Sequence, residues 1–170
     1  MTGFDSFLDE TLEAWWDVRN GLIEEVENIP ADKLDFRPTP EVRSVREMVQ
    51  HIIEVAMLVT GELARPDTNL QRMPIGKLIK HHGGAAYKAK TKKQLVALLR
   101  SQMQEAEEKF REAGELSLWQ FIERFDGKQG TKMQWLHHGI AQEMYHRGQL
   151  ATYARLLGLE PALTKRIRGG

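Results

Sequence analysis

Apolar residues recur every three or four positions along four long stretches of the chain, which is the spacing of one buried face of an α-helix. The first stretch covers residues 5–29 and ends at Pro30. The second starts after Ser44, which together with Glu47 has the sequence of a helix capping box, and extends to about Leu63. The pattern therefore predicts two long helices in the first part of the chain.

Two further long helices are predicted in the second half of the chain. Residues 91–113 contain no glycine or proline and keep one apolar face until Gly114. Residues 131–157 form the longest uninterrupted stretch, and Gly158 closes it. The inward face of this last helix is partly polar, which is unusual for a helix packed in a core.

The connections between these helices differ in character. Residues 64–91 hold two prolines and three glycines around the short apolar piece PIGKLIKHH, so we expect a long crossover with one or two helical turns. The aromatic stretch LSLWQFIERFDGKQG, residues 116–130, is compatible with a short helix or with an extended strip laid over the other helices.

The predicted fold is all-α, a four-helix bundle with its long crossover between the second and third helices. No alternation of apolar and polar residues is long enough to compete as a strand. No repeat, low-complexity tract or linker divides the chain, so residues 1–170 are expected to form one domain. A chain of 170 residues, 41% hydrophobic, can bury a core without disulfides or a structural zinc.

Composition narrows the classes of function. The chain has no cysteine, which excludes disulfides, thiolate metal sites and a cysteine nucleophile. Its 24 basic residues equal its 24 acidic ones, so no basic field favours a nucleic-acid partner. The start, MTGFDSFLDE, has no features of a leader, and no apolar run approaches the roughly 20 residues of a membrane span. We expect a cytoplasmic protein with no membrane partner.

His51 is the first candidate for chemistry, because its helix places it on the apolar face of Met48, Val55 and Leu58. A single histidine in such a place is more often a core residue hydrogen-bonded to a neighbour than a metal ligand. His51 alone therefore does not decide between the two.

The last helix favours a metal site over a core histidine, because three side chains that can bind a metal lie on one of its faces. They are His138, Gln142 and His146, which follow one another at four-residue steps. His138 and His146 are about 12 Å apart along the axis at 1.5 Å per residue, too far to share one ion. The predicted cluster is His51, Gln142 and His146, with His138 one turn away as a neighbour or as a residue that holds a ligand in place. The remaining histidines are expected at the surface: His81, His82 and His137.

Three segments carry a resemblance to a known family. The segment RSVREMVQHI resembles the second-helix motif of the DinB/YfiT-like superfamily, whose members are metal-dependent four-helix bundles. The segment QEMYHRGQLATYARLLG resembles the HxxxHRGQ motif in the last helix of that superfamily, and NIPADKLDFRPTP resembles its first connection. The resemblance implies an up-down-down-up bundle and commonly a homodimer. It also implies that three histidines bind nickel, zinc or iron, with water completing the coordination.

Carried over by position, His51 and His146 match two of the ligands, but the third position holds Gln142. A neutral amide oxygen is a weaker donor to a transition metal than imidazole, so we expect weak metal binding or a glutamine that holds a metal-bound water. Some relatives activate bacillithiol, mycothiol or glutathione for transfer to electrophiles or for isomerisation. A chain without cysteine is compatible with this chemistry, because the sulfur then comes from the cosubstrate.

Three hypotheses follow. The first is a metal-dependent thiol S-transferase or isomerase that acts on a small molecule. The second is a degenerate member of the family that binds no metal tightly and serves as a small-molecule or protein-binding module, for example in stress response. The third is that both histidines are core groups satisfied by hydrogen bonds.

Several other side chains have no assigned catalytic role. Glu54 and Glu143 suit a general base and a solvated helix flank equally well. Arg147 is expected to pair with Glu143 one turn earlier, although it can also bind the carboxylate of a thiol. Among the tryptophans, Trp16 suits a dimer contact, and three fit core positions: Trp15, Trp119 and Trp135.

Overall fold

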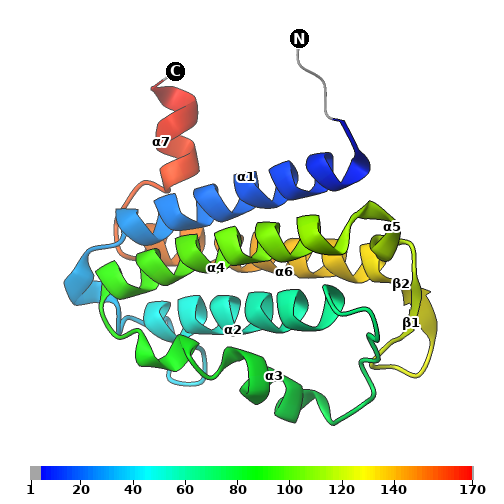
Figure 1. Ribbon diagram of the computed structural model, residues 1–170. Helices are drawn as coiled ribbons and strands as arrows, with labels where there is room; N and C mark the ends of the chain where they lie inside the picture. The colour runs from blue at the N-terminus through cyan, green and yellow to red at the C-terminus, as the bar shows by residue number, and fades with distance from the viewer. Residues whose placement is uncertain (1–4, 170) are drawn as a thin grey trace.

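Four long helices dominate the computed structural model, which describes residues 5–169 (Figure 1). They are α1 (Phe7–Asn28), α2 (Val45–Leu63), α4 (Lys92–Ala113) and α6 (Lys132–Leu156). Each packs against two of the others, in the pairs α1 with α4, α4 with α2, α2 with α6, and α6 with α1. Helices α2 and α4 run in one direction and α1 and α6 in the other, which is an up-down-down-up bundle (Figure 1). The predicted all-α class is confirmed.

The helix ends follow from local chemistry. Ser44 accepts a hydrogen bond from the backbone N–H of Glu47, whose carboxylate accepts from the N–H of Ser44, so the predicted capping box is present. Thr91 and Gln94 make the same reciprocal pair at the start of α4. Helix α4 ends at Gly114, whose φ of 77° is a conformation that favours glycine. The predicted boundaries of the long helices are therefore correct to within two residues.

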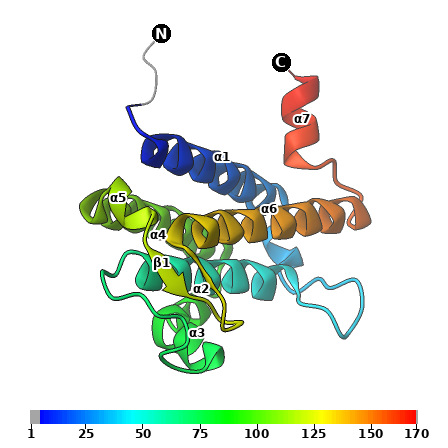
Figure 2. The same cartoon turned by 90° about the vertical axis from the view of Figure 1, so that its right-hand side faces the viewer.

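The crossover folds back onto the bundle. Helix α3 (Ile75–Gly83) packs on α2, on the side away from α1 (Figure 1 and Figure 2), and the 3-10 turn η2 (Ala86–Lys88) follows it. A Cβ at Gly83 would lie 2.5 Å from the Cβ of Glu54, so only glycine permits this close approach. A similar 3-10 turn, η1 (Ala31–Lys33), lies between α1 and α2. The crossover thus forms an additional layer over α2.

Two short helices and two short strands complete the part of the chain that the structure describes. Helix α5 (Glu115–Leu118) precedes an antiparallel hairpin of β1 (Phe121–Glu123) and β2 (Gln129–Thr131), in which Ile122 pairs with Gly130. The predicted alternatives, short helix and extended strip, both occur in this stretch. Helix α7 (Ala162–Arg168) was not predicted, and the buried carboxylate of Glu25 accepts hydrogen bonds from the backbone N–H groups at its start. Three-residue strands and a seven-residue helix are too short to produce a periodic pattern.

The exposure of the tryptophan side chains shows which of them belong to the core. Trp15 is fully buried, as expected, and Trp135 is half-buried. Trp119 is 47% exposed, so its assignment to the core was wrong. It follows α5 at the end of the bundle and meets Phe7 edge-on, which covers only part of its ring. Trp16 is half-buried and donates a hydrogen bond of 2.7 Å to Glu107 of α4.

Within residues 5–169, no helix has both the length and the apolar character needed to cross a membrane. The expectation that the chain starts without a leader falls partly on residues 1–4, which lie outside the described part of the chain.

Candidate functional site

The packing of α2 against α6 brings His51 and His146 together. The centroids of their rings are 5.1 Å apart and the ring planes are nearly perpendicular. The amide nitrogen of Gln142 lies 3.4 Å from Nε2 of His51. His146 is buried and His51 is largely buried. The structure therefore places the three side chains predicted as metal ligands in one cluster, which we call the histidine cluster: His51, Gln142 and His146.

Hydrogen bonds fix the orientation of both rings. Nδ1 of His51 lies 2.8 Å from the carboxylate of Glu54, and Nδ1 of His146 lies 2.6 Å from the side-chain oxygen of Gln149. Because both partners are acceptors, Nδ1 is the donor in each ring, and in a neutral ring Nε2 then keeps its lone pair. This is the tautomer in which an imidazole can bind a metal through Nε2.

Burial also controls the charge of His146. Desolvation lowers the pKa of His146 below its ordinary value, and electrostatic interactions with His51 and Arg43 act in the same direction. The hydrogen bond to Gln149 and the charge of Glu143 oppose the shift but do not cancel it. His146 is therefore neutral at physiological pH, as a metal ligand must be.

The residues of the cluster fit a divalent metal with three protein donors. The side-chain oxygen of Gln142 is buried and has no hydrogen-bond partner among the described residues, whereas its amide nitrogen faces Nε2 of His51, so the amide must rotate by half a turn before its oxygen can bind a metal beside His51. In the described part of the chain, no three His, Cys, Asp or Glu residues are arranged to hold a metal. Two imidazoles and one amide oxygen are therefore the donors that this site offers, a weaker set than three imidazoles.

Two partners of the cluster were not assigned by sequence reasoning. The sequence leaves Glu54 open between a general base and a solvated helix flank, and it predicts no role for Gln149. Each lies three residues after the histidine it binds, a helical spacing that allows side chains to meet and that signals such pairs. His138 is an exposed residue of α6, with its ring centroid 4.9 Å from that of Trp135.

A cavity of about 320 Å³ lies beside the histidine cluster. His51, His138 and Gln142 all contribute to its wall. Most of the remaining wall is apolar and comes from α2, α3, α6 and the hairpin loop, including Val55, Val59, Ile79, Phe125 and Trp135. A small, largely apolar space with a few polar groups is typical of a small-molecule binding site.

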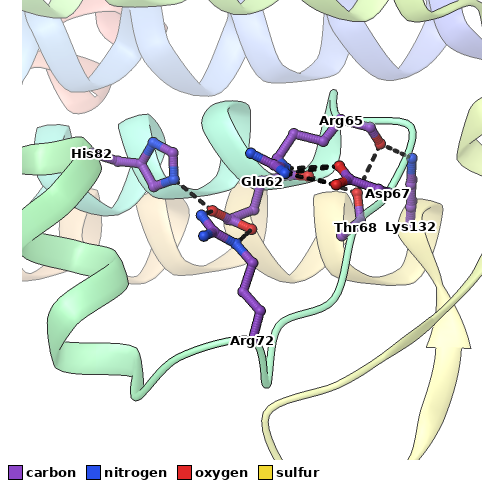
Figure 3. A network of polar contacts seen from close by, with 7 residues as sticks. All are labelled: Glu62, Arg65, Asp67, Thr68, Arg72, His82 and Lys132. Atoms are coloured by element: carbon purple, nitrogen blue, oxygen red, sulfur yellow. Dashed lines mark hydrogen bonds and ion pairs between the residues drawn. The ribbon is translucent and has the colours of Figure 1, made fainter.

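The carboxylate of Glu62 belongs to the same wall and ties the crossover to α2 (Figure 3). It is fully buried and accepts hydrogen bonds from both the Nε and a terminal nitrogen of Arg72, and it lies 2.6 Å from Nε2 of His82. We call Glu62, Arg72 and His82 the Glu62 cluster. The expected surface position of His82 was wrong, because α3 folds back and turns this side chain toward α2. His81 and His137 are exposed, as predicted.

Next to this cluster, a second group of contacts holds the start of the crossover (Figure 3). Thr68 donates to the backbone carbonyl of Glu62 at 2.7 Å, and Arg65 pairs with Asp67. Lys132, which is fully buried, donates to the backbone carbonyl of Arg65. Desolvation lowers the pKa of Lys132, and the nearby charge of Asp67 opposes that shift. Residues on α2, the crossover and α6 are thus joined at this end of the cavity.

The Glu62 cluster predicts a dependence of stability on pH. Burial by itself raises the pKa of Glu62, but the hydrogen bonds and charges of Arg72 and His82 outweigh burial, so the pKa lies below the ordinary value of 4.5. A carboxyl group with a lowered pKa stabilises the fold above its unfolded pKa, and this stabilisation is lost as the pH falls through the folded pKa. Glu62→Gln is therefore expected to cost roughly 1–3 kcal/mol of unfolding free energy at neutral pH.

This cost should shrink steadily as the pH falls below about 4.5, because the wild-type carboxyl then becomes neutral too. Urea denaturation of the two proteins at a series of pH values measures the difference. Glu105→Gln, at an exposed ion pair with Lys109, is the matched control and should change little. An equal cost of Glu62→Gln at pH 7 and at pH 3 would contradict the assignment.

Glu143 is not available to the cavity. It accepts hydrogen bonds from Nε of Arg19 at 2.9 Å, from a terminal nitrogen of Arg19 at 2.6 Å and from Nε1 of Trp15 at 2.8 Å. The expected pair of Arg147 with Glu143 was wrong, because α1 packs on α6 and Arg19 reaches the carboxylate first. The guanidinium of Arg147 instead lies over Gly21, in the place where a Cβ would be.

Fold and site together define an all-α bundle with a histidine cluster between its second and last long helices. The family model for the DinB family matches residues 4–168, so the chain belongs to the DinB family. No curated protein matches the chain in sequence.

Solved structures share the fold. A DinB-like protein of Bacillus subtilis, YjoA, is similar with a TM-score of 0.66 and 20% identity over 88% of this chain and 92% of that one. A mycothiol-dependent maleylpyruvate isomerase is similar with a TM-score of 0.67 and 14% identity, over 88% of this chain but only 63% of the isomerase. A mutant of a mycothiol-dependent maleylpyruvate isomerase gives a TM-score of 0.65 at 13% identity.

Proposed function

We propose that this protein is a metal-dependent enzyme that activates a low-molecular-weight thiol for reaction with a small electrophilic molecule, as a thiol S-transferase or isomerase. The observation that carries the proposal is the contact between the rings of His51 and His146, with Nδ1 of each ring bound to an acceptor. The mycothiol dependence of a structurally similar isomerase supports the choice of a thiol as cosubstrate.

Each residue of the site has a distinct part in this proposal. His51, His146 and Gln142 would hold nickel, zinc or iron, and Glu54 and Gln149 would keep the two rings in the binding tautomer. When bound, a divalent ion supplies positive charge that favours the deprotonated form of a coordinated thiol or water. The apolar wall excludes water from the reacting groups.

The reaction needs a sulfur from outside the chain, since the protein has no cysteine. In a transfer, the thiol sulfur forms a new bond to carbon, the leaving group departs with its bonding electrons, and the thiol proton passes to solvent. Bacillithiol, mycothiol and glutathione are the candidate cosubstrates. We also propose that the protein acts in the cytoplasm, as a homodimer.

A second candidate function follows from Gln142. An amide in place of a third imidazole weakens the donor set, and this favours a family member that binds a small molecule or a protein without catalysis, for example in stress response. In that case the cavity beside the histidine cluster would still bind its ligand.

A thiol-consumption assay distinguishes the two functions. The protein is incubated with zinc, nickel or iron, one of the three thiols and a generic electrophile such as 1-chloro-2,4-dinitrobenzene. We expect protein-dependent consumption with at least one thiol, reduced at least about 100-fold in His51→Ala because a metal donor is lost. His137→Ala, at an exposed position on α6, should keep the wild-type rate. If no thiol is consumed with any metal, the enzymatic proposal is wrong and the binding function is favoured.

A further inference from the structure

The wall of the cavity carries little charge. Among the described residues that line it, none is lysine or arginine, and the one carboxylate belongs to Glu62. Arg72 and His82 already bind both oxygens of that carboxylate. In the metal-free protein, an anionic group entering the cavity would lose its hydration and meet no free cationic side chain in this wall, which is strongly unfavourable.

The same wall contains a hydrogen-bond donor without a partner. Nε1 of Trp135 is buried and makes no hydrogen bond in the described part of the chain. The indole ring packs edge-on against two other rings, with centroid distances of 5.5 Å to Phe125 and 4.9 Å to His138. The guanidinium of Arg124 lies 5.4 Å from the centroid of the indole ring. Buried N–H groups are nearly always paired in folded proteins, so an unpaired one on a residue that lines a ligand-sized cavity favours an acceptor supplied by a bound molecule.

We propose that this cavity binds an uncharged, compact apolar group, aryl or branched alkyl, that carries a hydrogen-bond acceptor such as a carbonyl oxygen for the N–H of Trp135. The volume of about 320 Å³ is at the small end of the usual range of ligand sites. This inference rests on the proposed function in one respect, which is that the bound group is part of the electrophilic substrate.

The alternative occupant, the thiol cosubstrate, fits the cavity poorly. Glutathione carries carboxylates, and bacillithiol and mycothiol carry polar sugar groups, which the apolar wall cannot solvate. Val55, Val59 and Ile79 instead match the surface of a hydrocarbon group. The cavity therefore selects the electrophile, and the thiol approaches the histidine cluster from another side.

Three probes of similar size test this selection: benzamide, benzoate and toluene. Each is titrated into the full-length chain, dialysed against a chelator so that no metal captures benzoate, and binding is followed by NMR of the four tryptophan indole N–H groups. The Trp135 signal is the one missing from Trp135→Phe. We expect benzamide to shift this signal and to bind at least about tenfold more tightly than benzoate. Toluene should bind without shifting it downfield, because it offers no acceptor.

Two variants make the test specific to the cavity. Trp135→Phe keeps an aromatic wall but removes the donor, and should weaken benzamide about fivefold while leaving toluene unchanged. Val59→Phe fills the cavity and should abolish binding of both, whereas Val96→Phe, half-buried on α4 outside the cavity, should not. Equal or tighter binding of benzoate, or no binding of benzamide and toluene, would overturn the inference. Because no metal or thiol is present, these outcomes are independent of whether the enzymatic proposal holds.

Discussion

Gln142→His is expected to raise the affinity of the protein for zinc by about 10–100-fold or more, because it replaces a neutral amide donor with an imidazole. The amide nitrogen at this position already lies 3.4 Å from Nε2 of His51, and the amide oxygen is buried without a partner in the described part of the chain. A competitive titration with a chromophoric chelator measures the affinity. Metal analysis of protein purified without a histidine tag shows whether the variant retains metal that the wild type loses.

A variant that loses a ligand should change the zinc affinity in the opposite direction. His146→Ala removes one of two imidazoles and should reduce zinc affinity by at least about 100-fold. His137→Ala changes a histidine on the same helix that faces solvent, and it should bind zinc like the wild type. If Gln142→His binds zinc no better than the wild type, or if His146→Ala binds it equally well, the histidine cluster is not a metal site.

The long helices could be predicted because each repeats an apolar face over many turns and ends at a residue with a specific capping role. Ser44 and Thr91 cap through their side chains, and Gly114 stops α4 with a positive φ. The hairpin and α7 had no such signal. The start of α7 depends on Glu25, a residue of α1 far away in sequence, so no local pattern reveals it.

The site was predictable where it depended on spacing within one helix. Four-residue steps placed Gln142 and His146 on one face of α6, and the contact with His51 followed from packing two helices. The cavity was not predictable, because its wall depends on how the crossover folds back. Glu62 and His82 are 20 residues apart and meet only in the folded chain. A buried carboxylate with distant partners has no signature in a sequence.

The largest change in stability is expected from Arg19→Met, which should lower the unfolding free energy by about 3–5 kcal/mol. Arg19 is fully buried and pairs with the buried carboxylate of Glu143, and it also donates to Gln102 at 2.8 Å and to the backbone carbonyl of Leu99. Removing the guanidinium leaves the carboxylate in the core with Trp15 as its remaining donor. The cost is that of a buried charge without its counter-charge.

Comparing single and double variants separates the cost of an unpaired charge from the contribution of the ion pair. Arg19→Met combined with Glu143→Met removes both charges and should recover most of the lost stability in urea denaturation, because well-packed apolar replacements of buried ion pairs are often neutral. Arg100→Met, at an exposed pair with Glu27, is the matched control and should cost less than about 1 kcal/mol. A double variant as unstable as Arg19→Met would contradict this account.

Glu143 is adjacent to Gln142, so the pair also helps to fix the rotation of α6 that turns Gln142 toward His51. A stable double variant with weakened zinc binding would separate this positioning role from stability.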